Sequence, residues 1–162
     1  MLQAQWVQIG PATGSNGLTS LFVSGDTVFS SNSPGGSCYT TNLGLTWLQT
    51  GLSNANAVAG SKSGNVILIA ADKIYRSINN GANFTATSDA VIFTGVSIQN
   101  NLAAATTNGN GIYVSTNGGA TWAHPITPDH YTAVAVEGNY IFVSLAGQGL
   151  IRSTNSGATW EQ

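Results

Sequence analysis

The octapeptide "STNSGATW", residues 153–160, decides the fold, because it occurs four times in this chain with small changes. Every copy has Asn at its third position, Gly at its fifth and an aromatic residue at its eighth. The copies are Thr40–Trp47, Ser77–Phe84, Ser115–Trp122 and Ser153–Trp160. Their glycines recur every 37 or 38 residues, and so constant a period is typical of repeat proteins.

The rest of each repeat predicts short antiparallel strands. Apolar alternation, as in residues 21–24 and 133–136, leads into residue pairs that tolerate the positive φ of tight hairpins. These pairs are Gly25-Asp26, Gly64-Asn65, Asn100-Asn101 and Gly138-Asn139. Further short strands lie before and after each octapeptide, and no helical period separates them. Four short strands in a period near 40 predict an all-β fold, a β-propeller with four-stranded antiparallel blades. A β-solenoid fits less well, since its coils are shorter.

The repeats divide one domain, residues 1–162, into four predicted blades. Their approximate limits are 11–47, 48–84, 85–122 and 123–162. Residues 5–10, "QWVQIG", match the segment that follows an octapeptide, so they are predicted to be a strand that closes a ring. Two arrangements remain open: a four-bladed ring, or half of an eight-bladed ring in a homodimer, which we favour. A piece of a longer propeller and a designed propeller also fit the sequence.

The pattern S/T-x-N-x-G-x-T-W resembles the Asp-box, or BNR, repeat of propellers of the sialidase-like and photosystem-assembly-factor-like type, with Asn in place of Asp. In that family the motif forms the hairpin between the third and fourth strands of a blade, and its role is structural. The resemblance implies structural roles for Asn42, Gly44, Trp47, Asn79, Gly81, Phe84, Asn117, Gly119, Trp122, Asn155, Gly157 and Trp160.

Physical chemistry supports this interpretation of the octapeptide. A short amide side chain accepts hydrogen bonds from backbone N–H groups ahead of it, and the glycine adopts a positive φ at little cost. The final aromatic ring is expected to pack between adjacent sheets. The second copy departs most, with Asn83 and Phe84 at its end, and a looser turn is expected there.

Catalysis is not expected, although the resemblance brings glycosidases to mind. The sialidases of that family need three arginines, and this chain has only Arg76 and Arg152. A glycoside hydrolase of the xyloglucan-cleaving kind would require two of Asp72, Asp89 and Asp129 to converge on the loop face opposite the octapeptides. Short polar loops rarely form the deep cleft that this chemistry needs. We therefore predict no enzyme and no cofactor, and keep a glycosidase fragment as the third alternative.

The loop of residues 123–132 is the first choice for a ligand site. It contains His124, Asp129, His130 and Tyr131, and Tyr131 is expected to offer a stacking face to a glycan. A metal is not predicted, because a third ligand beside the two histidines is not evident.

Composition narrows the function classes further. Only 6% of the 162 residues are charged, and four Lys and Arg residues cannot form a basic surface for nucleic acid or an anionic membrane. The chain shows no signal peptide and no membrane-spanning apolar run, so a soluble protein is expected, its compartment unknown. Cys38 is the only cysteine, which rules out an intrachain disulfide. The leading hypothesis is a propeller scaffold or protein-interaction module that forms a homo-oligomer. A carbohydrate-binding module is the alternative, and the sequence names no ligand.

Overall fold

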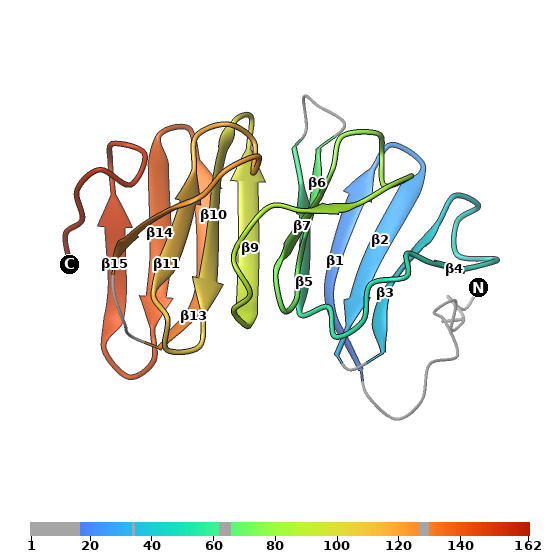
Figure 1. The fold of residues 1–162 in the computed structure, drawn as a ribbon, viewed down its shortest axis with the longest axis horizontal. Coiled ribbons are helices and arrows are strands. Elements are labelled where there is room, and N and C mark those ends of the chain that lie inside the picture. The colour runs from blue at the N-terminus through green and yellow to red at the C-terminus, as the bar shows by residue number, and fades with distance from the viewer. Residues whose placement is uncertain (1–16, 34, 62–65, 127–129) are drawn as a thin grey trace, which may run out of the picture.

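The computed structural model describes residues 17–33, 35–61, 66–126 and 130–162. The regular secondary structure in these residues is entirely β, in antiparallel sheets that follow one another along the chain (Figure 1). The predicted all-β propeller architecture is thereby confirmed. Three expected features lie outside the described residues: the strand at 5–10, the Gly64-Asn65 pair and Asp129.

Each sheet consists of strands in sequence order. The first sheet contains β1 (Leu18–Ser24), β2 (Thr27–Asn32), β3 (Gly36–Thr40) and β4 (Leu48–Gln49). The second contains β5 (Ala57–Gly60), β6 (Ile67–Ala70), β7 (Ile74–Ser77) and β8 (Thr85–Ala86). The third contains β9 (Phe93–Gln99), β10 (Leu102–Thr107), β11 (Ile112–Ser115) and β12 (Ala123–Ile126). The first three sheets thus continue past residues 47, 84 and 122 to include the strand after the octapeptide.

The fourth sheet has three strands, β13 (Tyr131–Glu137), β14 (Tyr140–Leu145) and β15 (Gly149–Ser153). An isolated antiparallel bridge between Arg152 and Glu161 takes the place of a fourth strand. Two backbone hydrogen bonds of 2.8 and 2.9 Å join these two residues. Glu161 therefore pairs where β4, β8 and β12 pair in the other sheets.

The hairpins between the first and second strands of the first, third and fourth sheets follow from the turn residues. Gly25, Asn100 and Gly138 have φ values of 57°, 54° and 59°, which Gly and Asn adopt with little strain. The octapeptide hairpins lie at the same end of the sheets. Gly118 N donates to Asn101 O at 2.7 Å in the third sheet, and Ser156 N donates to Asn139 O at 2.9 Å in the fourth.

The sheets stand side by side in an open row. The first strands contact one another in order, β1 with β5, β5 with β9 and β9 with β13. In Figure 1 the first sheet lies at the right end of the row and the fourth at the left end. Within the described residues, the row therefore does not close on itself.

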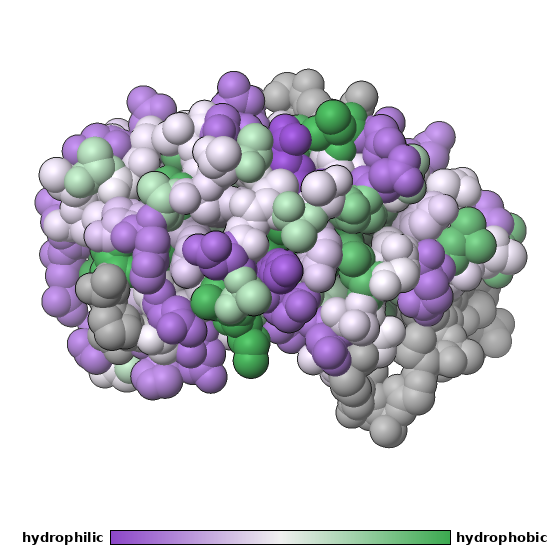
Figure 2. Space-filling model, in the orientation of Figure 1, coloured by the Kyte–Doolittle hydropathy of each residue, from purple (hydrophilic) through white to green (hydrophobic). Residues whose placement is uncertain are grey.

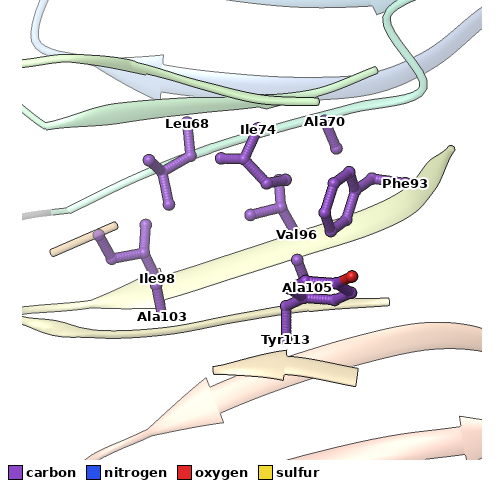
Figure 3. Close-up of a cluster of buried hydrophobic side chains, with 9 residues drawn as sticks. All are labelled: Leu68, Ala70, Ile74, Phe93, Val96, Ile98, Ala103, Ala105 and Tyr113. Atoms are coloured by element: carbon purple, nitrogen blue, oxygen red, sulfur yellow. The ribbon is translucent and has the colours of Figure 1, made fainter. Parts of the chain in front are cut away.

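Apolar clusters fill the three spaces between neighbouring sheets. Leu68 and Ile74 of the second sheet face Val96 and Tyr113 of the third (Figure 3). Phe29 meets Ile67 and Ile69 between the first and second sheets. Val114 meets Ile141 between the third and fourth. The second, third and fourth sheets each bury the face that looks toward the preceding sheet, so stacking of the repeats creates the core.

Candidate functional site

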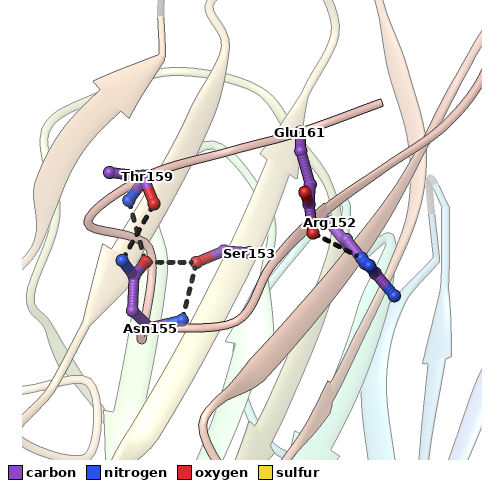
Figure 4. A network of polar contacts seen from close by, with 5 residues as sticks. All are labelled: Arg152, Ser153, Asn155, Thr159 and Glu161. Carbon is purple, nitrogen blue, oxygen red and sulfur yellow. Dashed lines mark hydrogen bonds and ion pairs between the residues drawn. The ribbon is translucent and has the colours of Figure 1, made fainter.

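The octapeptide hairpins form by one repeated set of hydrogen bonds. In the fourth copy, Ser153 Oγ donates to Asn155 Oδ1 at 3.0 Å (Figure 4). The same Oγ accepts from Gly157 N at 2.8 Å. Asn155 Oδ1 also accepts from Thr159 N at 2.8 Å, and Asn155 Nδ2 donates to Thr159 Oγ1 at 2.8 Å. The first and third copies repeat these contacts with Thr40, Asn42 and Thr46, and with Ser115, Asn117 and Thr121.

The second copy retains most of this pattern. Ser77 Oγ donates to Asn79 Oδ1 at 2.8 Å, and Gly81 N donates to Ser77 Oγ at 2.9 Å. Asn83 N reaches Asn79 Oδ1 at 3.0 Å. The bond from the amide nitrogen to a threonine hydroxyl is missing, because Asn83 stands in place of the threonine. The backbone turn is kept, with one side-chain contact fewer.

Every octapeptide glycine has one constraint, and three of the four have a second. Its φ is positive, 85° at Gly44, 83° at Gly81, 80° at Gly119 and 88° at Gly157. From the second copy onward it also lies against a side chain of the preceding sheet. A Cβ at Gly81 would come within 2.5 Å of the Phe29 ring, and a Cβ at Gly119 within 2.7 Å of Leu68. The glycine thus permits both the turn and close packing between sheets.

In three of the four copies the aromatic residue that ends the octapeptide packs between sheets, as predicted. Phe84 packs on the cluster between the first and second sheets, Trp122 on the next and Trp160 on the last. Trp122 Nε1 also donates to Thr87 Oγ1 of the preceding repeat at 3.2 Å. Trp47 lines an apolar groove on the first sheet. The octapeptide therefore forms the turn, and its aromatic side chain packs between neighbouring sheets and stabilises their contact.

The described residues of the loop predicted as a ligand site, His124, His130 and Tyr131, are not gathered around one ligand position. His124, in β12, stacks on Tyr113 with ring centroids 4.5 Å apart. His130 Nδ1 lies 2.6 Å from Asn108 Oδ1. Tyr131 is 4% exposed and packs in the core between the third and fourth sheets. The expectation that Tyr131 offers a stacking face is wrong, because its ring is buried.

The described acidic residues are dispersed. Asp72 accepts from Tyr75 Oη at 3.1 Å, and Glu137 accepts from Gln99 Nε2 at 2.7 Å. Glu161 pairs with Arg152 at 2.7 Å. Within the described ranges, no three His, Cys, Asp or Glu residues are placed to bind a metal, and no helix could cross a membrane.

A groove between the second and third sheets was not predicted from the sequence. It has a volume of about 470 Å³ and is lined by Thr87, Ser88, Asp89, Tyr113, Thr121 and Trp122, with two alanines. Burial and, to a smaller extent, the charge of Asp89 raise the pKa of the Tyr113 phenol, which stays protonated. The only signal in the sequence was Asp89 placed shortly before a strand, and nothing there indicated that Tyr113 lies nearby.

Comparison with known proteins agrees with the hairpin geometry. Residues 113–124 match the family model of the BNR/Asp-box repeat. The GH74 xyloglucanase from Xanthomonas campestris is similar in fold, with a TM-score of 0.76, 14% identity, and coverage of 91% of this chain and 30% of that one. YCF48 from Cyanidioschyzon merolae gives a TM-score of 0.71 and 16% identity, covering 98% and 59%. No curated protein shows a sequence match.

The computationally designed Ika4 protein gives a TM-score of 0.70 at 13% identity and covers 90% of this chain and 96% of its own. The chain spans less than two thirds of the xyloglucanase and of YCF48, and at these identities the likeness shows the fold. The fold is a β-propeller array, and the third of its four octapeptide hairpins is the segment that matches the Asp-box repeat. In this chain asparagine occupies the aspartate position of all four repeats.

Proposed function

We propose that this chain is a non-catalytic propeller module that joins a second copy of itself in a closed ring, and that the ring serves as a scaffold for binding other proteins. The observation that carries the proposal is the open row of sheets. The first and fourth sheets lie at opposite ends, so each has a face that no other described strand covers (Figure 1). A closed ring removes both open faces, as propellers and other cyclic assemblies do.

The two end faces both carry exposed apolar side chains. In the view of Figure 2 the surface is largely polar, with apolar residues in separate small areas. On the first sheet, Leu21 and Val23 are 60% and 61% exposed. On the fourth, Tyr140 and Leu150 are about half exposed. Exposed apolar side chains that share one sheet face favour association with another apolar face.

We propose that the chain has no catalytic role because its described carboxylates are not paired in a groove. Glycoside hydrolysis of the common kind uses two carboxyl groups about 5–10 Å apart. The groove between the second and third sheets is lined by one described carboxylate, Asp89. Of the other described carboxylates, Asp72 contacts Tyr75, Glu137 contacts Gln99, Glu161 contacts Arg152, and Asp26 lies in the turn between β1 and β2. We expect no release of reducing sugar from xyloglucan, and loss of a measured activity in Asp89→Asn would contradict the proposal.

A role in binding proteins is supported by one similar structure. YCF48 bound to a D1 peptide gives a TM-score of 0.63 at 15% identity, so at least one propeller of this shape takes a peptide. We extend to this chain only the class of ligand, a polypeptide.

Sedimentation velocity of the purified chain tests the ring. The expected species has twice the mass of the 16.6 kDa chain. A single species of 16.6 kDa at micromolar concentration would rule out the self-associating scaffold.

A carbohydrate-binding module is the second candidate, favoured by the groove beside Asp89. The half-buried indole of Trp122 provides a face for sugar stacking, and Asp89 and Thr121 provide polar groups for sugar hydroxyls. A glycan array probed with the wild-type chain, Asp89→Asn and the control Asp26→Asn tests this site. Binding that only Asp89→Asn abolishes supports the site, and no binding on a broad array contradicts it.

A further inference from the structure

The three contacts between neighbouring sheets share one geometry. The octapeptide glycine of each later sheet lies against a side chain on a central strand of the sheet before it. Gly81 lies on Phe29, Gly119 on Leu68 and Gly157 on Val114, where an added Cβ would be 2.5, 2.7 and 3.1 Å from the nearest side-chain atom. We call such a contact a junction. The described residues contain three complete junctions, and one half-junction remains at each end of the row of sheets.

One junction also contains a charged hydrogen bond. Arg76 Nε, on the second sheet, donates to Gly118 O in the octapeptide of the third sheet at 2.7 Å. Gly118 immediately precedes the glycine that lies on Leu68. Arg76 is paired with Leu68 across the two central strands. The arginine and the apolar side chain thus receive two successive residues of the next octapeptide.

The fourth sheet presents an equivalent pair, an arginine and an apolar residue, on its open face. Arg152 is paired with Phe142, as Arg76 is with Leu68, and each arginine immediately precedes the first residue of an octapeptide. Within the described chain, Arg152 forms an ion pair with Glu161, with both side chains more than half exposed. An exposed pair of this kind contributes about 0–1 kcal/mol, so its rearrangement costs little.

The first sheet presents the other half of a junction. Its octapeptide has leucine at two positions, Leu43 and Leu45, where the later copies have Asn80, Gly118 and Ser156, and three alanines. These leucines are 78% and 81% exposed. Leu43 also has a φ of 58°, a conformation that costs a residue with a Cβ about 1–2 kcal/mol. Solvent-exposed leucine at a strained position is poorly suited to a free hairpin and well suited to an apolar interface.

An apolar groove lies beside this hairpin. It has a volume of about 460 Å³ and is lined by Leu18, Leu21, Val28, Thr40, Leu43, Gly44 and Trp47. Val28 pairs with the first residue of its octapeptide, as Ile67 and Ile141 do in the second and fourth sheets. Ile67 and Ile141 are buried against the preceding sheet. The residues that would face a preceding sheet are therefore present on the first sheet as well.

We infer that the fourth sheet of one copy receives the first octapeptide of a second copy, with Gly44 on Phe142 and Leu43 O accepting a hydrogen bond from Arg152 Nε. The occupant is a second copy because both half-junctions belong to this one sequence and match each other by register. Two such junctions related by a two-fold axis close a ring of two chains and leave no open sheet face. This inference rests on the proposed self-association and specifies its interface.

Two single variants test the interface, Leu43→Glu and Phe142→Lys, each of which places a charge in an apolar contact. We expect each to weaken the dimer by roughly 100-fold or more in sedimentation equilibrium. Ile92→Glu is the matched control and should leave the dimer unchanged. Ile92 is 65% exposed and lies in the segment that connects β8 to β9, away from both end sheets. Circular dichroism and thermal melting at low concentration check that the variant monomers are folded.

Mixing the two variants distinguishes this interface from a symmetric one. In the mixed dimer one junction has wild-type residues and the other brings opposite charges together, so an equimolar mixture should regain the dimer. If the wild-type chain and both variants all form dimers, this interface is wrong, although the proposed self-association still holds. A wild-type monomer would instead overturn the proposed function itself. A third outcome also overturns the inference: Leu43→Glu is monomeric, Phe142→Lys remains a dimer, and mixing does not bring Leu43→Glu into a dimer. That result would indicate a symmetric interface formed by the two first sheets.

Discussion

Asn117 and Thr121 exchange two hydrogen bonds across the third octapeptide hairpin. Thr121 N donates to Asn117 Oδ1 at 3.0 Å, and Asn117 Nδ2 donates to Thr121 Oγ1 at 2.8 Å. The same Oδ1 accepts from Ser115 Oγ at 2.8 Å. The amide therefore uses its donor and its acceptor in one turn, whereas a carboxylate would only accept. The asparagine in all four repeats closes the hairpin without a charge.

Two substitutions of Asn117 should distinguish how much its acceptor oxygen and its donor nitrogen each contribute to stability. Asn117→Ala removes the three contacts above and should lower the free energy of unfolding by about 1–3 kcal/mol. Asn117→Asp keeps the acceptor, and the Thr121 hydroxyl turns to donate to it, so the expected loss at pH 7 is below about 1 kcal/mol. Urea unfolding of both variants provides the measurement. A loss as large for aspartate as for alanine would contradict the assigned hydrogen bonds.

Gly119 should be far more sensitive to alanine than a glycine in an open turn. Gly119→Ala places a methyl group 2.7 Å from Leu68 and keeps an unfavourable φ of 80°. Gly147 has a similar φ of 74° and open space around it, so Gly147→Ala isolates the cost of the backbone. We expect losses of about 3 kcal/mol and about 1 kcal/mol respectively. Equal losses in thermal or urea unfolding would mean that the glycine does not support packing between sheets.

Much of this fold follows from the sequence, because the octapeptide combines turn chemistry and packing in one local segment. The constant spacing of Gly44, Gly81, Gly119 and Gly157 predicted the repeated sheets, and the hydrogen bonds of Asn42 and its equivalents agree with the predicted hairpin. Local rules succeed here because each contact within the hairpin spans four residues or fewer.

The error at Tyr131 has a local physical cause. Simple alternation along β13 would place Tyr131 on the open face with Ala133 and Ala135. The register shifts between Tyr131 and Ala133, where Tyr131 pairs with Leu145 and Ala133 with Ser144. A bulge of this kind transfers a side chain to the other face of a sheet. The sequence carries no clear mark of it, so the burial of Tyr131 could not be predicted.

The sequence did not predict the groove beside Asp89 and did not decide between a closed and an open row of sheets, for a different reason. Both depend on how one repeat is placed against the next, and that placement joins residues far apart in the sequence, such as Thr87 and Trp122, which are 35 residues apart. Periodicity fixes the number of repeats but not the angle between sheets.

Leu43→Asn should have opposite effects on two quantities: it should stabilise the folded monomer and weaken the dimer. Asparagine tolerates a φ near 58° better than leucine does, and Asn80 has a φ of 55° at the equivalent position. At concentrations where the chain is monomeric, we expect the free energy of unfolding to rise by about 0.5–1 kcal/mol. The dimer should weaken at the same time, because the apolar side chain is lost from the interface. A lower monomer stability by urea unfolding would contradict the assigned strain at Leu43.

Cys38 should be unreactive in the folded chain. Its thiol lies at 2% exposure in β3, and burial raises the pKa of this thiol, with a smaller opposite effect from the neighbouring Ser30. Because the thiolate is the reactive form, a disulfide reagent at pH 8 should label the native chain far more slowly than the chain in 8 M urea, a difference of roughly 100-fold or more.

The same raised pKa sets a pH dependence of stability. Below the pKa of the unfolded thiol both states hold the proton, and the contribution of Cys38 is fully present. As the pH rises above about 8.5, the unfolded chain ionises first, so the free energy of unfolding falls until the folded thiol also ionises. Cys38→Ala should remove this part of the decline between pH 8 and 10, measured by urea unfolding. If wild type and Cys38→Ala decline with identical slopes, or if native Cys38 is labelled as fast as the unfolded chain, the thiol is accessible and the described packing of β3 is wrong.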